Sequence, residues 1–296
     1  MADKDGRSIG FVGLGLMGSA FTRRLVERGY SVVGFDAIAD KVAAAGGHGV
    51  LAASSAADVT RRAEIVLMCV TSTHAVEEAV FGPEGIAAGG SAGKIVVDHS
   101  TSEMAATREL SAKLKAACGM SWVDAPVSGG PGAAAAGTLA IMAGGEDSAI
   151  ARIAPVMSDL SAAFTHLGPV GAGQATKMVN QVLVLNTYCV LAEALRLAER
   201  CGVDASKIPQ ALAPGHAGSN MLKSVFPQMI ARDFAPRGFA RQVLKDLDML
   251  HDVSKEMKAP LPMSAQANTL FRLLVARGHG ELDATAVLKL YLDEPV

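Results

Sequence analysis

The sequence predicts an α/β fold, with an N-terminal Rossmann-like doubly wound sheet followed by an all-α C-terminal domain. Short β-branched runs alternate with helical stretches through the first half of the chain, which is typical of a parallel sheet covered by helices on both faces. The segment GPVGAG, residues 168–173, is the clearest boundary signal, and only helical periodicity follows it. We therefore expect a dinucleotide-binding domain at 1–171. An all-helical substrate and oligomerisation domain is expected at 172–296, beginning with a long interdomain helix.

The first domain is expected to alternate strands and helices. Apolar runs predict buried strands at residues 9–13, 31–36, 64–70, 94–100 and 121–127. The stretches between them predict helices at residues 16–28, 54–62, 73–80 and 102–117. A further strand-like piece, TLAIMAGG, precedes a helix expected at 146–157. The segment PGAAAAG is expected to form a tight loop and a short helix.

The second domain shows one apolar helical pattern after another. Helices are expected at residues 174–201, 207–212, 221–230, 239–257, 263–277 and 285–292. Prolines break or start these helices, because proline lacks a backbone donor and is tolerated only in the first helical turn; they are Pro214, Pro227, Pro236, Pro260 and Pro262.

Composition limits the class of function. Half of the 296 residues are hydrophobic, 19% are charged and the net charge is −2, so a sizeable core is expected and nucleic acid or a membrane surface is not the expected partner. The four cysteines show no C-x-x-C spacing, which favours reduced thiols in a cytoplasmic protein. The polar N-terminus turns directly into a strand, unlike a signal peptide. The most apolar segment, 178–198, contains Asn180, Gln181, Asn186 and Glu193, so we expect no membrane-spanning helix.

A glycine pattern follows the first expected strand. Gly13, Gly15 and Gly18 form G-x-G-x-x-G between that strand and a helix. The first glycine allows a tight turn, the second lets a pyrophosphate approach the backbone, and the third lets helix and strand pack closely. The helix N-terminus offers free N–H groups to the phosphates. The pattern predicts a dinucleotide site, with a flavin or an S-adenosyl donor as the alternative ligand.

An acidic residue ends the second expected strand. Asp36 lies 18 residues after Gly18, where a carboxylate accepts hydrogen bonds from the adenosine ribose and repels a 2′-phosphate. Ala37 follows at a position where an NADP site more often supplies arginine. We therefore expect NAD as the cofactor, while Lys41, about one turn later, keeps NADP as the less favoured alternative.

Lys177 lies in the first turn of the long helix at 174–201. The positive end of a helix is a poor place for a cation. Asn180 and Gln181, three and four residues on, share its face and offer amide groups that can orient a substrate oxygen. This arrangement suggests a lysine that exchanges a proton with a substrate, which requires the side chain to be largely buried. The alternative is an ordinary solvated lysine.

Five ordered motifs resemble one known family. FVGLGLMG, DHSTS, DAPVSGGPGAAAAGTLAIMAGG, GAGQATKMVNQ and VLKDLDM occur in the order and roughly the spacing of the β-hydroxyacid dehydrogenases. That group includes 3-hydroxyisobutyrate dehydrogenase, tartronate semialdehyde (2-hydroxy-3-oxopropionate) reductase and L-threonate dehydrogenase. The resemblance covers nearly the whole chain and implies a reversible NAD-linked dehydrogenase of a short β-hydroxy acid, without a metal.

The resemblance also implies a role for each matching residue. Lys177 matches the catalytic lysine, and Asn180 matches the amide that orients the substrate. The loop Ser128, Gly129 and Gly130 matches the segment that grips the substrate carboxylate, assisted by Lys245, which also reaches the cofactor. The implied cofactor-binding residues are Gly13, Leu14, Gly15, Leu16, Met17, Gly18, Asp36, Val70, Thr71, Thr101 and Lys245.

Some positions depart from the family pattern and leave the substrate open. Gln181 resembles the tartronate semialdehyde reductases, whereas 3-hydroxyisobutyrate dehydrogenases typically have asparagine there. His99 stands where a small or apolar residue is expected, and His216 lies in the segment implied to line the distal substrate pocket. Arg241, four residues before Lys245, either pairs with a second anionic group of the substrate or forms a structural ion pair.

Several alternatives remain open at this point. Tartronate semialdehyde, 3-hydroxyisobutyrate and a sugar acid such as threonate all fit the implied site. Imine reductases share the architecture but replace the catalytic lysine, and a 6-phosphogluconate-type decarboxylase would need a longer helical domain. A non-catalytic NAD-binding module is the alternative from a different class. The long helix is apolar over more than one face, so a homodimer or homotetramer is expected.

Overall fold

The structure of this chain is a computed structural model that describes residues 8–292. The first seven residues, on which the prediction about a signal peptide depends, lie outside this range. Contacts divide the chain into two compact units, Met1–Lys177 and Met178–Val296. The division falls inside helix α8 (Ala172–Arg200), which belongs to both units.

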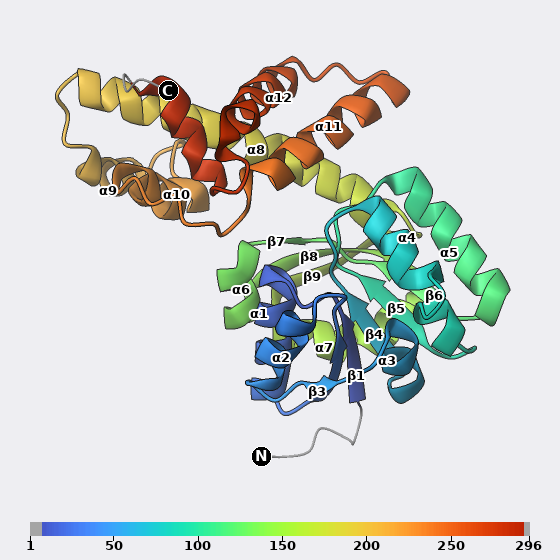
Figure 1. The fold of residues 1–296 in the computed structure, drawn as a ribbon. Coiled ribbons are helices and arrows are strands. Elements are labelled where there is room, and N and C mark those ends of the chain that lie inside the picture. Colours follow the sequence, from blue (N-terminus) through green and yellow to red (C-terminus); the bar gives the residue numbers. More distant parts are fainter. Residues whose placement is uncertain (1–7, 293–296) are drawn as a thin grey trace. The chain divides into compact units, whose positions relative to one another are not determined.

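A mixed sheet forms the centre of the first unit (Figure 1). In the described residues its strands run in the order β3-β2-β1-β4-β5-β6-β8-β7, with β9 paired to β8. The first six in this order are parallel, and both β6 and β7 pair antiparallel with β8. The strands are β1 (Ser8–Val12), β2 (Ser31–Phe35), β3 (Leu51–Ala52), β4 (Ile65–Met68), β5 (Ile95–Asp98), β6 (Ser121–Asp124), β7 (Val127–Ser128), β8 (Leu139–Gly145) and β9 (Ser161–Gly168).

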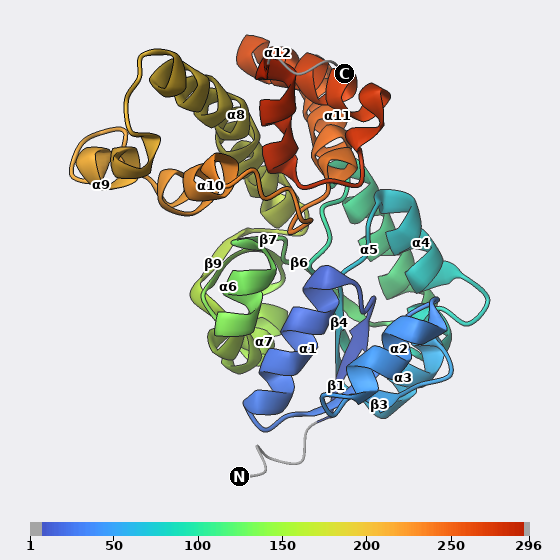
Figure 2. The same cartoon turned by 60° about the vertical axis from the view of Figure 1, so that its left-hand side comes forward.

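Helices cover both faces of this sheet (Figures 1 and 2). One face carries α1, α6 and α7, and the other carries α3, α4 and α5. The helices of this unit are α1 (Leu16–Glu27), α2 (Ala39–Gly46), α3 (Ala56–Arg62), α4 (Thr73–Phe81), the short 3₁₀ helix η1 (Ile86–Gly89), α5 (Met104–Cys118), α6 (Gly130–Ala136) and α7 (Asp147–Leu160).

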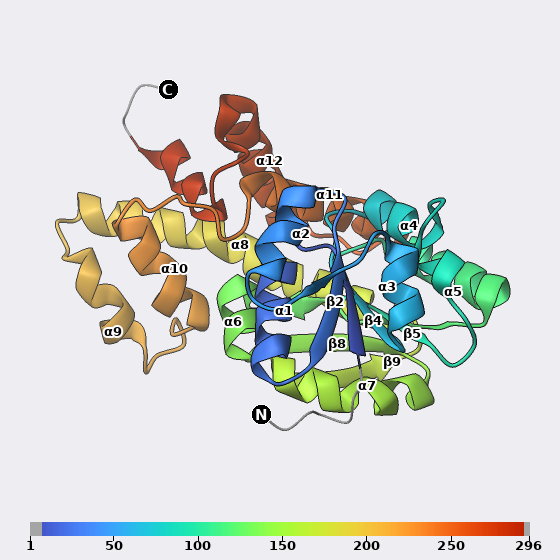
Figure 3. The ribbon, with the colours of Figure 1, turned by 60° about the horizontal axis from the view of Figure 1, so that its bottom comes forward.

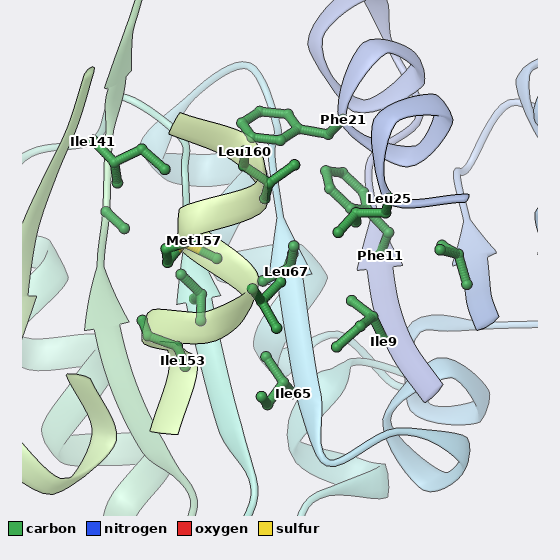
Figure 4. Packing of buried hydrophobic residues seen from close by; sticks show 14 of the residues in the cluster. Ile9, Phe11, Phe21, Leu25, Ile65, Leu67, Ile141, Ile153, Met157 and Leu160 are labelled. Carbon is green, nitrogen blue, oxygen red and sulfur yellow. The ribbon is translucent and has the colours of Figure 1, made fainter. Parts of the chain in front are cut away.

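Alternation along the strands divides the core into two layers. In β4, Ile65 and Leu67 face the layer under α1 and α7, whereas Val66 and Met68 face the layer under α3, α4 and α5. Figure 4 shows the first layer, where Phe21 from α1 and Met157 from α7 meet these strand residues. Both faces of the strands are therefore buried, which explains why they read as continuous apolar runs.

The structure corrects the predicted strands in three places. The run at 121–127 is not one strand, because β6 ends at Asp124. After Ala125 and Pro126 the chain continues as β7, which pairs antiparallel with β8. Strands β3 and β9 and helix α2 were not predicted. Strand β9 is mostly exposed and lacks an apolar alternation, so it gave no pattern to find. The predicted parallel sheet is confirmed for most of its strands, and among the described strands the antiparallel pairs are β6 with β8 and β7 with β8.

The second unit is helical, as predicted. One predicted boundary is wrong, because Pro227 lies inside a helix, Asn220–Ile230, and neither starts nor breaks it. Figures 2 and 3 show α9 and α10 on one side of α8, with α11 and α12 on another. Buried residues from these helices form one core, which includes Leu195, Phe226, Leu247 and Phe271. The remaining elements are η2 (Ala205–Lys207), α9 (Ile208–Leu212), α10 (Asn220–Ile230), α11 (Ala240–Glu256), α12 (Pro262–Leu274), the π-helical η3 (Val275–His279) and the 3₁₀ helix η4 (Ala284–Tyr291).

Within the described residues, α8 is the one helix long and apolar enough to cross a membrane by length and composition. Core helices of soluble proteins pass the same test. Two polar residues of α8 have partners inside the helical unit: Asn186 donates to Ser264 Oγ at 3.0 Å, and Gln181, which is 5% exposed, donates to Asp246.

Candidate functional site

The glycine loop after β1 has the geometry that a pyrophosphate site needs. Gly13 adopts φ +93°, and a Cβ there would lie 2.3 Å from the carbonyl oxygen of Cys69. A Cβ on Gly18 would lie 1.9 Å from the carbonyl oxygen of Gly13, so helix α1 packs directly on the turn. Gly15 is different, because a Cβ there would meet nothing within 4 Å. The space beside Gly15 is open to an approaching ligand.

Helix α1 begins at Leu16 without a side-chain cap on its N-terminus. Its first-turn N–H groups are therefore available to an anion, and the helix dipole favours negative charge there. The loop lies after β1, whose neighbours are β2 on one side and β4 on the other, which is the point where the strand order reverses. The residues present thus fit a dinucleotide phosphate.

Asp36, directly after β2, is tied to the glycine loop. Its Oδ2 accepts a hydrogen bond from Leu14 N at 2.7 Å and its Oδ1 accepts one from Ile38 N at 2.9 Å. Nζ of Lys41 lies 3.6 Å from Oδ1. Each carboxylate oxygen has further lone pairs, so Asp36 can still accept from ribose hydroxyls. Lys41 is the residue that left NADP as an alternative cofactor in the sequence analysis, and here its amine pairs with the Asp36 carboxylate.

The ends of β4 and β5 bring other predicted residues to the same edge of the sheet. Val70 and Thr71 follow β4, and Thr101 follows β5. A hydrogen bond of 2.9 Å from Val70 N to Ser100 Oγ joins the two loops. Because parallel strands end at one edge, these loops lie with the glycine loop at the carboxyl ends of the strands.

Lys177 is buried, with 8% of its surface exposed. Its Nζ donates a hydrogen bond to the carbonyl oxygen of Val127 at 2.7 Å. Val127 immediately precedes Ser128, and Gly129 and Gly130 then adopt φ values of +129° and +69°. The structure therefore brings the predicted lysine to the chain segment of the predicted carboxylate loop, with the lysine itself largely buried. The catalytic role of Lys177 stays a prediction.

A buried polar network holds the start of α8, and the sequence interpretation missed it. Asp124 Oδ1 and Oδ2 accept hydrogen bonds from Gly171 N at 2.7 Å and Gln174 N at 2.9 Å. The Gln174 side chain accepts from Ser102 N at 3.2 Å and donates to Ser100 O at 2.8 Å. The first turn of α8, and with it Lys177, is thereby fixed to the ends of β5 and β6.

Two neighbouring carboxyl groups in this network are unusual in their ionisation. Burial raises the pKa of Asp98 to about 7, and the charge of Asp124 raises it too, against hydrogen bonds from Ser100 and Ser102 that lower it. Burial also raises the pKa of Asp124 to about 6, although backbone hydrogen bonds, including those from Gly171 and Gln174, lower it. The strands place the two residues side by side. Near neutral pH this pair of carboxyls holds part of its protons.

His99 is buried between the sheet and α1. Its ring stacks on Phe21 with centroids 4.9 Å apart, and Nδ1 lies 2.7 Å from the carbonyl oxygen of Ala125. Burial lowers the pKa of His99 to about 4, so the ring is neutral near pH 7 and Nδ1 carries the proton that it donates. His99 thus fills an aromatic packing position, which accounts for a departure that the sequence left unexplained.

The helical unit contains a second group of predicted residues. Asn180 Nδ2 donates to Gln181 Oε1 at 2.8 Å, and Gln181 Nε2 donates to Asp246 Oδ2. Nζ of Lys245 lies 3.0 Å from Asp246 Oδ1. The sequence interpretation named Asn180 and Lys245 but did not assign a role to Asp246, which connects them.

The structure also describes the surroundings of Arg241 and His216. Nε of Arg241 lies 2.6 Å from Glu281 Oε1, and its guanidinium stacks over Phe239 at 4.6 Å. This is the structural ion pair left open as an alternative, and the role of Arg241 in substrate binding stays a prediction. His216 is exposed in the loop before α10.

Two hollows in the surface contain none of the predicted site residues. One of about 360 Å³ is lined by α11 and α12 residues such as Leu250 and Ala265, and one of about 250 Å³ is lined by residues such as Arg108 and Trp122. Among residues 8–292, no group of three or more His, Cys, Asp or Glu residues is placed to hold a metal ion. The candidate site is therefore located by its side chains and loops.

Comparison with known proteins also indicates a dinucleotide-binding protein. A family profile described as the NAD binding domain of 6-phosphogluconate dehydrogenase matches residues 8–168, and one described as the NAD-binding domain of NADP-dependent 3-hydroxyisobutyrate dehydrogenase matches residues 171–291. The chain belongs to the β-hydroxyacid dehydrogenase family. It is therefore an NAD(P)-binding oxidoreductase that acts on the CH–OH group of a hydroxy acid.

Individual β-hydroxyacid dehydrogenases resemble the chain over nearly its whole length. A 2-(hydroxymethyl)glutarate dehydrogenase of Eubacterium barkeri is 35% identical, covering 96% of this chain and 94% of its own. A 2-hydroxy-3-oxopropionate reductase of Escherichia coli is 32% identical, covering 95% and 96%. A crystal structure of a 3-hydroxyisobutyrate dehydrogenase from Salmonella typhimurium has a TM-score of 0.87 at 29% identity, covering 96% of this chain and 99% of that one.

Proposed function

We propose that this β-hydroxyacid dehydrogenase is NAD-linked and interconverts a short β-hydroxy acid and its semialdehyde or keto form, with Lys177 as general acid and base. One observation carries the proposal: Nζ of Lys177 donates to Val127 O at 2.7 Å, one residue before Ser128. An amine that is 8% exposed beside a glycine-containing loop suits a substrate held by its carboxylate with the carbinol at the amine.

In this proposal each residue of the candidate site has a separate role in the reaction. In the oxidation, Nζ of Lys177 accepts the hydroxyl proton, and in the reduction the protonated amine returns it to the developing alkoxide. The nicotinamide ring, when bound, supplies the hydride chemistry. Asn180 orients the reacting oxygen, and the loop Ser128, Gly129 and Gly130 binds the carboxylate with Lys245.

The acid is proposed as a class. Relatives named for 2-(hydroxymethyl)glutarate and 2-hydroxy-3-oxopropionate share a carboxylate and a carbinol or aldehyde. A threonate-type sugar acid is the second candidate, favoured by a relative named L-threonate dehydrogenase. NAD is proposed over NADP because Asp36 holds negative charge beside the glycine loop and pairs with Lys41. A cytoplasmic location and the absence of membrane and nucleic-acid partners stay predictions from composition.

The first experiment measures reduction of NAD⁺ and NADP⁺ by the purified protein against a panel of β-hydroxy acids. Wild type is compared with Lys177→Ala and with Lys223→Ala, an exposed lysine of α10 that serves as the matched control. We expect turnover with NAD⁺ that falls at least about 100-fold in Lys177→Ala and not in the control, as for a general acid–base group. Activity surviving in Lys177→Ala would rule out the mechanism. If no acid is oxidised, a second assay follows oxidation of NADH and NADPH with imines, and turnover there would support the reductase alternative.

We also propose that the protein is a homo-oligomer assembled through α8. Four apolar residues of α8 are between 52% and 67% exposed: Val179, Leu183, Val190 and Leu197. At 3.6 residues per turn they fall within about 40° of one another around the helix, so they form a straight apolar stripe. A stripe of this kind on a core helix suits a second copy of the chain.

A further inference from the structure

Three side chains of the helical unit form a directional chain of hydrogen bonds. Asp246 Oδ2 accepts from Gln181 Nε2, and Gln181 Oε1 accepts from Asn180 Nδ2 at 2.8 Å. Gln181 is 5% exposed and the Asp246 side chain is 13% exposed, so both contacts are largely shielded from water. Asn180 and Gln181 lie one turn after Lys177 in α8, and Asp246 comes from α11.

The direction of this chain follows from the carboxylate. An ionised carboxylate can only accept hydrogen bonds, so Gln181 must turn its NH₂ group toward Asp246. The carbonyl oxygen of Gln181 must then face Asn180, and only the NH₂ group of Asn180 can donate to it. Asn180 therefore keeps its own carbonyl oxygen, Oδ1, and its second N–H for other partners. An amide without such a chain could present either end.

We infer that Gln181 and Asp246 are positioning residues that fix which atoms of Asn180 meet the substrate. Asp246 sets the direction, Gln181 transmits it, and Asn180 presents Oδ1 as acceptor and one N–H as donor to the oxygens of the hydroxy acid. The inference rests on the proposed function, in which Asn180 orients the reacting oxygen. It also gives Gln181, the residue that departs from the common asparagine, a defined task.

The same atoms explain why Asp246 suits this position better than an amide would. Its Oδ1 lies 3.0 Å from Nζ of Lys245, so the carboxylate is held between a cation and an amide donor. Asparagine at 246 could donate or accept, and it would leave both orientations of Gln181 available. Glutamate at 181 would place two carboxylates in contact, which cannot both be ionised at low cost.

The test exchanges the two groups. Gln181→Glu and Asp246→Asn are compared with the double variant and with Gln266→Glu, an exposed position of α12 that undergoes the same chemical change. In the double variant, a carboxylate at 181 accepts from the amides on both sides, so Asn180 is again forced to donate through Nδ2. We expect kcat at pH 8 to fall about 10- to 100-fold in each single variant, as for a misplaced orienting group, and to recover in the double variant.

Two further readouts separate a positioning role from a merely structural one. In Gln181→Glu, kcat should rise again as pH falls, because one shared proton restores the pattern of donors and acceptors, while wild type shows no such rise. Thermal unfolding is measured on the same proteins without substrate. The midpoint of Gln181→Glu should fall between pH 5 and pH 8 more than in wild type, and this extra fall should vanish in the double variant and be absent in Gln266→Glu.

Each outcome decides the inference. Loss in both single variants with recovery in the double variant supports it. Single variants as active as wild type at pH 8, or unfolding midpoints that recover without recovery of kcat, would overturn the positioning role. A wild type that oxidises none of the acids would overturn the proposed function and this role with it, while the unfolding data would still report whether Gln181 and Asp246 are in contact.

Discussion

At the scale of single residues, the three glycines of the nucleotide loop are required for three different reasons. Gly13 needs a positive φ, Gly18 lies against the Gly13 carbonyl, and Gly15 leaves open space. The requirements at Gly13 and Gly18 come from the fold itself. The requirement at Gly15 comes only from a ligand that approaches the loop, so substitutions at Gly15 and Gly18 should separate effects on binding from effects on folding.

We expect Gly15→Ala to fold normally and to bind cofactor poorly. Gly15 has φ −67°, which alanine adopts without strain, and its Cβ would meet nothing within 4 Å. The thermal midpoint should stay near that of wild type, while the Kd for NAD⁺ measured by calorimetry rises by about tenfold or more because the methyl group fills the ligand's space.

Gly18→Ala is the matched comparison. Its Cβ would lie 1.9 Å from a backbone oxygen, so the free energy of unfolding should fall by about 1–3 kcal/mol, as for overpacked sites. A Gly15→Ala protein that binds NAD⁺ as well as wild type would show that the cofactor phosphates lie elsewhere.

The sequence predicted those residues of the candidate site that follow a local pattern. The glycines, Asp36 and Lys177 stand at fixed offsets from element boundaries, so spacing was enough to propose them. Asp124 and Gln174 could not be found in this way. Asp124 bonds backbone N–H groups 47 and 50 residues away, and such a contact exists only after the sheet has formed.

At the scale of elements, the ends of β5 and β6 hold the first turn of α8 by hydrogen bonds. Asp98 and Asp124 are register partners there, and both are buried. Because Asp98 keeps its proton to about pH 7 in the folded state and releases it near 3.8 when unfolded, the folded protein binds more protons between these values. Its contribution to stability is therefore full at low pH and is lost as pH rises through about 7.

We expect this pH dependence to disappear in Asp98→Asn. Between pH 5 and pH 8, the free energy of unfolding of wild type should fall relative to that of the variant, as measured by urea denaturation. Asp40→Asn, an exposed site in the same unit, is the control and should follow wild type. Asp124, whose pKa is raised to about 6, acts with the same sign, and His99 acts with the opposite sign below pH 6.5. Both residues are present in all three proteins, so the comparison between wild type and variant isolates Asp98. Parallel curves for wild type and Asp98→Asn would contradict the buried, protonated carboxyl.

The sequence analysis missed strands whose formation depends on tertiary pairing and not on a local sequence pattern. Strand β9 pairs with β8 although most of its residues are exposed, and β7 is only two residues long. Neither has the alternation or length by which a strand is recognised in sequence. The buried parallel strands β4 and β5 and the long helices were predicted because their patterns are strong.

At the scale of the whole molecule, one helix connects two differently built units. The sequence predicted this division because strand alternation stops after residue 168 and helical periodicity continues to the end. The first turn of α8 is hydrogen-bonded to Asp124 in the sheet, while Leu185 and Leu195 of the same helix belong to the helical core. The contact division after Lys177 therefore falls within a continuous element, and a boundary at 171 stays a prediction.

The apolar stripe on α8 leads to a prediction about assembly. Leu183 is 67% exposed in the middle of the stripe, and Met263 of α12 is equally exposed but outside it. If the stripe is covered by a second copy, Leu183→Glu buries an unpaired charge in the interface, which costs several kcal/mol, whereas Met263→Glu stays in water. Sedimentation equilibrium should give a multiple of the 30.4 kDa chain mass for wild type and Met263→Glu, and a shift toward the single chain for Leu183→Glu. A wild type of one chain mass at micromolar concentration would refute the assembly. Loss of oligomers in both variants would place the interface on more than this stripe.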